Sequence, residues 1–213
     1  MLHHDFLTNK GKVIHKWHHY LPIYERHLQK FVNQSVTIWE IGVFQGGSLS
    51  MWKRFLGPFA TVVGIDIDAA CKAHEEHQIQ VRIGDQSDMA FLQTVLDEFG
   101  VPDIIIDDGS HQMKHLTKTF DFLYPKLSKN GVYIVEDLHT AYWSEFEGGL
   151  RRKGSFIEKS KDQIDDLNAR HIRENHPTRF AETTFSMCFY DSLIVYERVD
   201  WSKSRFLTHT MIP

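Results

Sequence analysis

Residues 104–115 read IIIDDGSHQMKH, so three consecutive isoleucines run directly into two aspartates, a glycine, a serine and a histidine. Three β-branched apolar residues in a row are typical of a strand that is buried on both faces of a sheet. Such a strand would end at Asp107 and Asp108, with His111 following closely. The segment therefore predicts a parallel sheet with titratable groups gathered at its edge.

Short apolar runs of this kind alternate with segments of helical periodicity along most of the chain. We expect strands at residues 37–42, 61–67, 79–83, 104–106 and 132–135. We expect helices at residues 20–31, 48–56, 87–99 and 112–127. Ser48 and Ser87 are the expected N-caps of the second and third of these helices, and Gly100 ends the third. The alternation predicts an α/β fold with parallel strands and crossover helices.

The last part of the chain follows a different pattern. Residues 183–190 and 193–199 are strand-like runs joined at Asp191 and Ser192, which predicts an antiparallel hairpin. The segment before it, residues 142–182, is charged and prone to form helices. Without a linker, a repeat or a low-complexity tract, residues 1–213 are expected to form a single domain.

Composition excludes several classes of protein. A formal charge of −4 gives no field that would attract nucleic acid or an acidic membrane. Cys71 and Cys188 are far apart and suit neither a disulfide framework nor a zinc site. The histidine pairs His3–His4, His18–His19 and His74–His77 lack the spacing of a metal site and are expected to be solvated surface residues. No stretch is apolar enough for a signal peptide or a membrane span, so the cytoplasm is the expected location.

Acidic residues mark the end of every predicted parallel strand. In an open α/β sheet, ligands bind in the crevice beyond the carboxyl ends of the strands. Turns favour aspartate, which would explain one acidic strand end but not five on one edge. The acids concerned are Glu40, Asp66, Asp85, the pair Asp107 and Asp108, and the pair Glu136 and Asp137.

The glycine-containing loop EIGVFQGGS, residues 40–48, limits the kind of ligand. Phe44 stands where the dinucleotide fingerprint has its second glycine, which disfavours a pyrophosphate close to the backbone. The chain also lacks the G-K-[ST] motif of nucleoside triphosphatases. A nucleoside without phosphates would tolerate this loop. Asp66 is then placed to accept hydrogen bonds from ribose hydroxyls, and Asp85 to receive an adenine amino group.

Five segments in order carry a family resemblance: WEIGVFQGGS, VVGIDID, GDQSD, IIIDDGSH and YIVEDLH. Together they resemble the metal-dependent S-adenosylmethionine O-methyltransferases of the mycinamicin and macrocin type. Those enzymes methylate hydroxyls on macrolide sugars, and the family includes proteins called cephalosporin hydroxylases. The likeness runs from about residue 5 to residue 199. It implies a Rossmann-like class I methyltransferase fold whose mostly parallel seven-stranded sheet ends in the predicted hairpin.

The resemblance also implies roles for individual residues. Asp108, Glu136 and Asp137 match the family's Mg²⁺ ligands, and His111 matches its catalytic base, so His111 and Asp108 are the expected catalytic residues. Expected cofactor contacts are Glu40, Gly42, Phe44, Gly46, Ser48, Asp66, Asp85, Gln86 and Asp108. Expected acceptor contacts are His139, Tyr142 and Trp143.

Two flanking segments are expected to cover the site. Residues 1–35 would cover the cofactor, with Tyr20 and Tyr24 as candidates for closing over it, and residues 142–182 would cover the acceptor. The extra N-terminal domain of some family members is not matched, so their mode of assembly does not carry over. A homo-oligomer is nevertheless expected, because the family tends to self-associate.

The chemistry suits these residue types. Clustered carboxylates make a hard oxygen site for Mg²⁺, and a bound dication lowers the pKa of a coordinated hydroxyl. An imidazole such as that of His111 titrates near neutral pH, where a general base is most effective. His139 is the alternative base, and His111 would then be only a neighbour of the helix N-cap.

The expected function is Mg²⁺-dependent transfer of a methyl group from S-adenosylmethionine to a hydroxyl, most simply on a sugar of a natural product or glycan. The expected partner is a small glycosylated or polyhydroxyl acceptor. Two alternatives stay open: a metal-dependent hydrolase or hydroxylase on the same scaffold, and a non-catalytic nucleoside-binding subunit.

Overall fold

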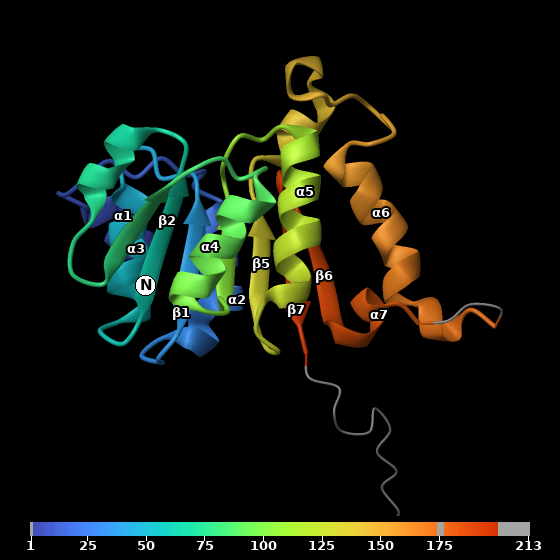
Figure 1. The fold of residues 1–213 in the computed structure, drawn as a ribbon, viewed down its shortest axis with the longest axis horizontal. Coiled ribbons are helices and arrows are strands. Elements are labelled where there is room, and N and C mark those ends of the chain that lie inside the picture. Colours follow the sequence, from blue (N-terminus) through green and yellow to red (C-terminus); the bar gives the residue numbers. More distant parts are fainter. Residues whose placement is uncertain (1, 174–176, 200–213) are drawn as a thin grey trace, which may run out of the picture.

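The structure of the chain, a computed structural model, describes residues 2–173 and 177–199. Its centre is a seven-stranded sheet in the order β3-β2-β1-β4-β5-β7-β6 (Figure 1). The strands are β1 (Thr37–Ile41), β2 (Thr61–Asp66), β3 (Ile79–Ile83), β4 (Ile104–Asp107), β5 (Val132–Val135), β6 (Thr184–Tyr190) and β7 (Leu193–Arg198). The first five are parallel, and β7 pairs antiparallel with both β5 and β6. The predicted strands and the terminal hairpin are confirmed.

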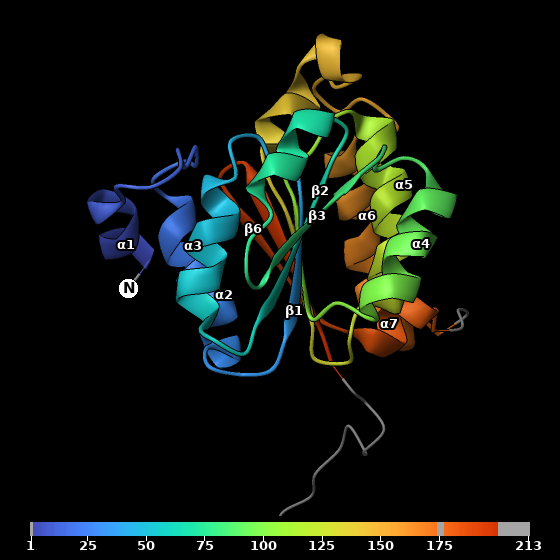
Figure 2. The same ribbon diagram turned by 60° about the vertical axis from the view of Figure 1, so that its left-hand side comes forward.

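Helices cover both faces of this sheet, as Figure 2 shows: α1 to α3 lie on one face and α4 to α7 on the other. They are α1 (Leu2–Thr8), α2 (Tyr20–Leu28), α3 (Gly47–Leu56), α4 (Met89–Phe99), α5 (Met113–Leu123), α6 (Phe156–Leu167) and α7 (Arg179–Thr183). Each face has its own hydrophobic cluster. None of the helices in the described part of the chain is both long and apolar enough to cross a bilayer.

The strand register brings the acids to one edge. Ile41 of β1 lies opposite Asp107 of β4, and Asp107 lies opposite Val135 of β5. The residues that follow these three strands therefore leave the sheet at the same level. Gly42 shows how close they come, because a Cβ on it would lie 2.1 Å from the carbonyl oxygen of Asp108. Gly42 also has φ of +94°, which only glycine adopts without strain.

Two predicted helix caps are wrong. Helix α3 begins at Gly47 with Gly46 as its N-cap, and the Ser48 hydroxyl instead donates a hydrogen bond of 2.6 Å to Glu40 Oε2. Helix α4 is capped by Asp88, not Ser87, and the Asp88 side chain accepts from the backbone amides of Ala90 and Phe91. In both cases a neighbouring residue has the backbone geometry that a cap needs. The predicted end at Gly100 is confirmed.

The helix predicted for residues 112–127 is shorter than expected, since α5 ends at Leu123 and a 3₁₀ turn containing Pro125 follows. Residues 9–19, which we call the strap, form neither helix nor strand. The strap connects α1 to α2 and passes the carboxyl edge of the sheet, where Lys16 meets carboxylates that follow or lie within β1, β4 and β5. It lies inside the segment predicted to cover the cofactor.

Candidate active site

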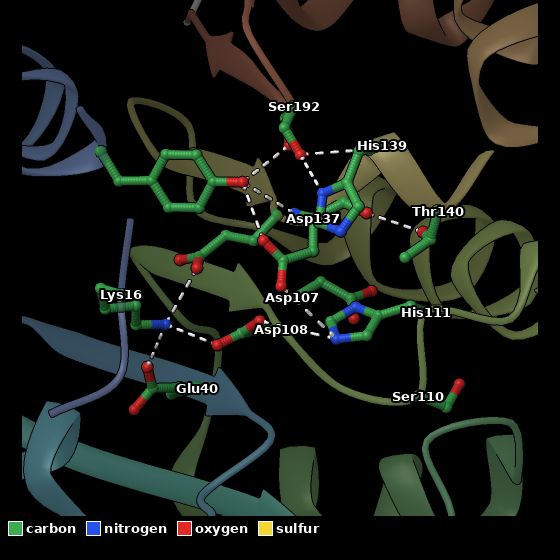
Figure 3. Close-up of polar contacts among 12 residues, drawn as sticks. Lys16, Glu40, Asp107, Asp108, Ser110, His111, Asp137, His139, Thr140 and Ser192 are labelled. Carbon is green, nitrogen blue, oxygen red and sulfur yellow. Dashed lines mark hydrogen bonds and ion pairs between the residues drawn. The ribbon is translucent and has the colours of Figure 1, made fainter. Parts of the chain in front are cut away.

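Three side chains converge just beyond the ends of β4 and β5 (Figure 3). His111 Nε2 lies 3.9 Å from Asp108 Oδ1 and 3.8 Å from Asp137 Oδ2. One atom from each residue lies within 4.8 Å of the others, so together they could hold a metal ion. All three side chains are only partly exposed. We call Asp108, His111 and Asp137 the metal-candidate trio.

Two members of this trio have an unusual backbone. His111 has φ of +55° and Asp137 has φ of +53°, in the left-handed region that non-glycine residues rarely occupy. Such conformations cost of order 1–3 kcal/mol each and persist only where the surroundings hold them. In addition, His111 Nδ1 is buried and has no hydrogen-bond partner among the described residues. Backbone strain and an unpaired polar atom at one place are features of sites built for a ligand.

A lysine that the sequence did not single out lies at the centre of the other carboxylates. Lys16 Nζ is 2.7 Å from Asp108 Oδ2, 2.9 Å from Glu136 Oε2 and 3.1 Å from Glu40 Oε1. Its side chain is 2% exposed. Burial opposes a charge on this amine, but the three carboxylates raise the pKa of Lys16 well above its usual value. The strap thus inserts an ammonium ion among acids from three adjacent strands.

Glu136 is turned toward this ammonium. Its Oε1 accepts a hydrogen bond of 2.6 Å from the Tyr24 hydroxyl, while Oε2 faces Lys16. Burial raises the pKa of the Glu136 carboxyl, and the charge of Lys16 opposes that rise. Of the three predicted metal ligands, the structure brings Asp108 and Asp137 together with His111. Glu136 lines the same pocket of about 190 Å³ as Asp108 and Asp137, but both of its carboxylate oxygens are bound by Tyr24 and Lys16.

The two tyrosines that are candidates for closing over the cofactor bind carboxylates. Tyr24 reaches Glu136, and the Tyr20 hydroxyl donates a hydrogen bond of 2.9 Å to Asp137 Oδ1. The backbone amide of Asp137 in turn donates to the Tyr20 oxygen. Helix α2 thereby fixes both acids that follow β5. Sequence periodicity places these tyrosines on α2, but it gives no signal for what their hydroxyls contact.

A cavity of about 190 Å³ lies beyond the ends of β1, β2 and β3. Four of the predicted cofactor residues line it, namely Gly42, Asp66, Asp85 and Gln86. Backbone amides of Asp68, Val43 and Phe44 donate to the Asp66 carboxylate and lower its pKa, although burial opposes this. The backbone amide of Ser87 lowers the pKa of Asp85. Both acids line the cavity as carboxylates, which can accept hydrogen bonds from hydroxyls or an amino group.

The remaining predicted cofactor residues do not line this cavity. Glu40 and Ser48 are buried and bind each other, and Asp108 lies in the metal-candidate trio. Gly46 packs against the His74 ring, and Phe44 is 62% exposed. Contacts from these residues to a cofactor stay a prediction.

The predicted acceptor residues lie on the opposite side of the trio. His139 Nδ1 is 2.6 Å from Ser192 Oγ, and the His139 ring lies between two exposed indoles, 6.0 Å from Trp17 and 4.7 Å from Trp143. These residues line a hollow of about 280 Å³. Sequence reasoning named His139 and Trp143 but missed Trp17 and Ser192, which come from the strap and the hairpin turn.

Tyr142 lies in an adjoining groove. The groove has a volume of about 610 Å³ and runs between α6 and the hairpin, with Ile157, Ile164 and Phe189 in its walls. It shares His139 and Ser192 with the hollow. Tyr142, Ile157 and Ile164, which belong to the segment predicted to cover the acceptor, line this groove, and the covering role stays a prediction. Residues 174–176 of that segment are outside the described residues.

Comparison with known proteins finds relatives of this chain. The chain is 37% identical over 198 residues to 8-demethyl-8-α-L-rhamnosyl tetracenomycin-C 2′-O-methyltransferase from Streptomyces olivaceus, covering 86% of this chain and 51% of the relative. It is 41% identical over 139 residues to mycinamicin VI 2″-O-methyltransferase from Micromonospora griseorubida, covering 62% of this chain and 34% of the relative. The resemblance to the sugar O-methyltransferases is confirmed.

A solved structure agrees with this result. The MycE methyltransferase of the mycinamycin biosynthetic pathway, in complex with Mg, SAH and mycinamycin VI, matches with a TM-score of 0.81 at 31% identity. The match covers 93% of this chain and 52% of that one. The expected Rossmann-like methyltransferase fold is confirmed. The chain spans about half the length of these sugar O-methyltransferases or less. No protein-family model matches it.

Proposed function

We propose that this chain is an S-adenosylmethionine-dependent O-methyltransferase that uses Mg²⁺ and acts on a sugar hydroxyl of a small glycosylated molecule. The single observation that carries the proposal is the convergence of Asp108, His111 and Asp137 between a cavity on one side and an aromatic hollow on the other. The sugar O-methyltransferase relatives support both the donor and the type of acceptor.

The residues present fit a magnesium site. Asp108 and Asp137 offer carboxylate oxygens, the ligands that Mg²⁺ prefers. Lys16 binds Asp108 Oδ2 and Tyr20 binds Asp137 Oδ1, while the second oxygen of each carboxylate faces His111. Glu136 would be the third carboxylate once its contact with Lys16 is given up. A bound Mg²⁺ would supply Lewis acidity that lowers the pKa of an acceptor hydroxyl.

His111 is the residue we assign as general base. Its Nε2 faces the carboxylates, so a hydroxyl held beside them would lie within reach of the imidazole. His139 stays the alternative base, but its Nδ1 is held at 2.6 Å by Ser192 and its ring packs against Trp143.

The hollow and groove suit a glycoside. Ligand sites combine apolar walls with a few polar groups that fix orientation. Trp17 and Trp143 offer flat apolar surfaces for the ring face of a sugar, and His139 and Ser192 offer hydrogen bonds. The groove lined by Ile157, Ile164 and Phe189 would then receive an apolar aglycone. A homo-oligomeric state, the absence of nucleic-acid partners and a cytoplasmic location stay predictions.

The direct test incubates the protein with S-adenosylmethionine, Mg²⁺ and a panel of deoxysugar glycosides carrying polyketide aglycones. We expect mass spectrometry to show one added methyl group on the sugar and an equal amount of S-adenosylhomocysteine. Chelation of the metal and the variant Asp137→Asn should both abolish the product. Asp97→Asn, on the exposed surface of α4, is the matched control and should keep full activity.

Other products would point to the alternatives. A hydroxylated or hydrolysed product without S-adenosylhomocysteine would replace the proposal with the hydrolase or hydroxylase reading. Binding of S-adenosylmethionine without turnover on any acceptor of the panel would favour the non-catalytic reading.

A further inference from the structure

The two oxygens of the Asp108 carboxylate face two different places, and each place suits a cation. Oδ2 lies 2.7 Å from Lys16 Nζ, whereas Oδ1 faces His111 and belongs to the metal-candidate trio. The first place already holds the ammonium of Lys16, which also contacts Glu40 and Glu136. At the second place, no lysine or arginine of the described residues forms an ion pair with Asp108 Oδ1 or Asp137 Oδ2. The two places are joined by one small carboxylate.

A divalent ion and Lys16 would therefore draw on the same acids. Two of the three carboxylates assigned to Mg²⁺ under the proposed function, Asp108 and Glu136, are the two nearest partners of Lys16. Like charges repel most strongly where water is excluded, and the Lys16 side chain is 2% exposed. The contact with Lys16 occupies Glu136 Oε2, while the Tyr24 hydroxyl occupies Oε1. Lys16 thus stabilises the carboxylates when no metal ion is bound. It opposes the arrangement of the same carboxylates that would hold a metal ion.

We propose that Lys16 is a positioning residue that competes with the divalent cation: its ammonium holds Asp108 and Glu136 until the ion binds and then gives them up. This inference rests on the metal site of the proposed function and adds a resident counter-charge to it. Burying three carboxylates without any cation would be costly. The lysine therefore stabilises the fold when no ion is bound, while it weakens the affinity of the site for the ion.

The competition has a consequence for the strap. Lys16 is its one residue with ion pairs to Asp108, Glu136 and Glu40 among the described contacts, and Trp17 follows it directly. Trp17 is 54% exposed and forms a wall of the acceptor hollow. Release of Lys16 would loosen the strap and free Trp17 to adjust to an acceptor. Ion binding and acceptor binding would then be coupled through two adjacent residues.

Calorimetric titration with MgCl₂ alone tests the competition without any turnover. We expect Lys16→Met to bind Mg²⁺ at least about tenfold more tightly than the unchanged protein, because a positive charge is removed beside the ion. Lys16→Arg keeps the charge and should bind Mg²⁺ like the unchanged protein. Lys12→Met is the matched control on the same strap, since Lys12 Nζ contacts only a backbone carbonyl, that of His74, among the described hydrogen bonds. It should leave the affinity unchanged.

Hydrogen exchange on the unchanged protein tests the same idea if Lys16→Met fails to fold. Amides of residues 9–19 should exchange faster with saturating MgCl₂ than without it, and Asp108→Asn should show no such change. Equal affinities of Lys16→Met and the unchanged protein, or a strap that exchanges no faster with Mg²⁺ bound, would overturn the inference and leave the proposed function standing. Absence of Mg²⁺ binding to both proteins would overturn the two together.

Discussion

At the scale of the residue, the geometry of His111 decides how its role is best tested. The residue has φ of +55°, so alanine at this position would add backbone strain to the loss of the imidazole. Asparagine tolerates the left-handed region far better and cannot act as a base at neutral pH. His111→Asn should therefore lower kcat by ~10²–10⁴-fold, the usual contribution of a general base, with unchanged affinity for S-adenosylmethionine.

Steady-state kinetics and calorimetry together check this prediction. His139→Ala is the matched control, because His139 lies beside the trio on the acceptor side. We expect it to raise the KM for the acceptor more than it lowers kcat. If His139→Ala lost turnover while His111→Asn kept it, the base would be His139.

The residues that sequence reasoning found and missed differ in how their contacts are made. Asp108, His111 and Asp137 each follow a recognisable strand within a few residues, so strand order alone brings them to one edge. Lys16 reaches Asp108 across 92 residues of sequence and Glu136 across 120. Its surroundings, IHKW, carry no periodicity that would mark a buried ammonium. Long-range partners of a loop residue come from tertiary packing, which a single sequence does not encode locally.

At the scale of the element, the strands and helices were predictable where apolar periodicity was strong and less so at their ends. All five parallel strands and the hairpin match, because short β-branched runs leave few alternatives. The N-caps at Ser48 and Ser87 did not match, since several residues near each helix start can cap it. Ser48 illustrates the cause, because its hydroxyl donates a hydrogen bond to the buried Glu40 carboxylate and does not cap the helix.

A prediction at this scale concerns the contact between α2 and the hairpin. Glu197 of β7 accepts from His27 of α2 at 3.2 Å and from Ser186 of β6 at 2.9 Å. These partners, His27 first, lower the pKa of Glu197 to about 2. Because the folded pKa lies below the unfolded value, the carboxylate stabilises the fold above pH ~4.5 and loses this effect as the pH falls toward 2.

Glu197→Gln should accordingly lower the free energy of unfolding by about 1–3 kcal/mol at neutral pH and by almost nothing near pH 2. Urea denaturation at a series of pH values measures this difference. The exposed Glu182, whose ion pair with Arg170 is 3.6 Å long, supplies the control Glu182→Gln with little effect at any pH. A destabilisation by Glu197→Gln that is equal at all pH values would show that packing, not the charge, is lost.

At the scale of the whole molecule, the candidate site is assembled from parts that are distant in sequence. Asp108 follows β4, Asp137 follows β5, Tyr20 belongs to α2 and Lys16 to the strap. The unfolded chain has no such cluster, so an ion that binds there binds the folded state alone. Binding of this kind must stabilise the whole fold by mass action.

Mg²⁺ should therefore raise the midpoint of thermal unfolding. At a concentration about 100 times its Kd, a ligand specific for the folded state adds about 2.7 kcal/mol of stability. For a chain of this size each kcal/mol shifts the midpoint by roughly 2–4 °C, so the expected rise is about 5–10 °C. Differential scanning calorimetry with and without MgCl₂ measures it, and a chelator should reverse it. Asp137→Asn should remove the shift, whereas Asp97→Asn should keep it. A midpoint that rises equally in both variants would mean that Mg²⁺ binds elsewhere than at the end of β5.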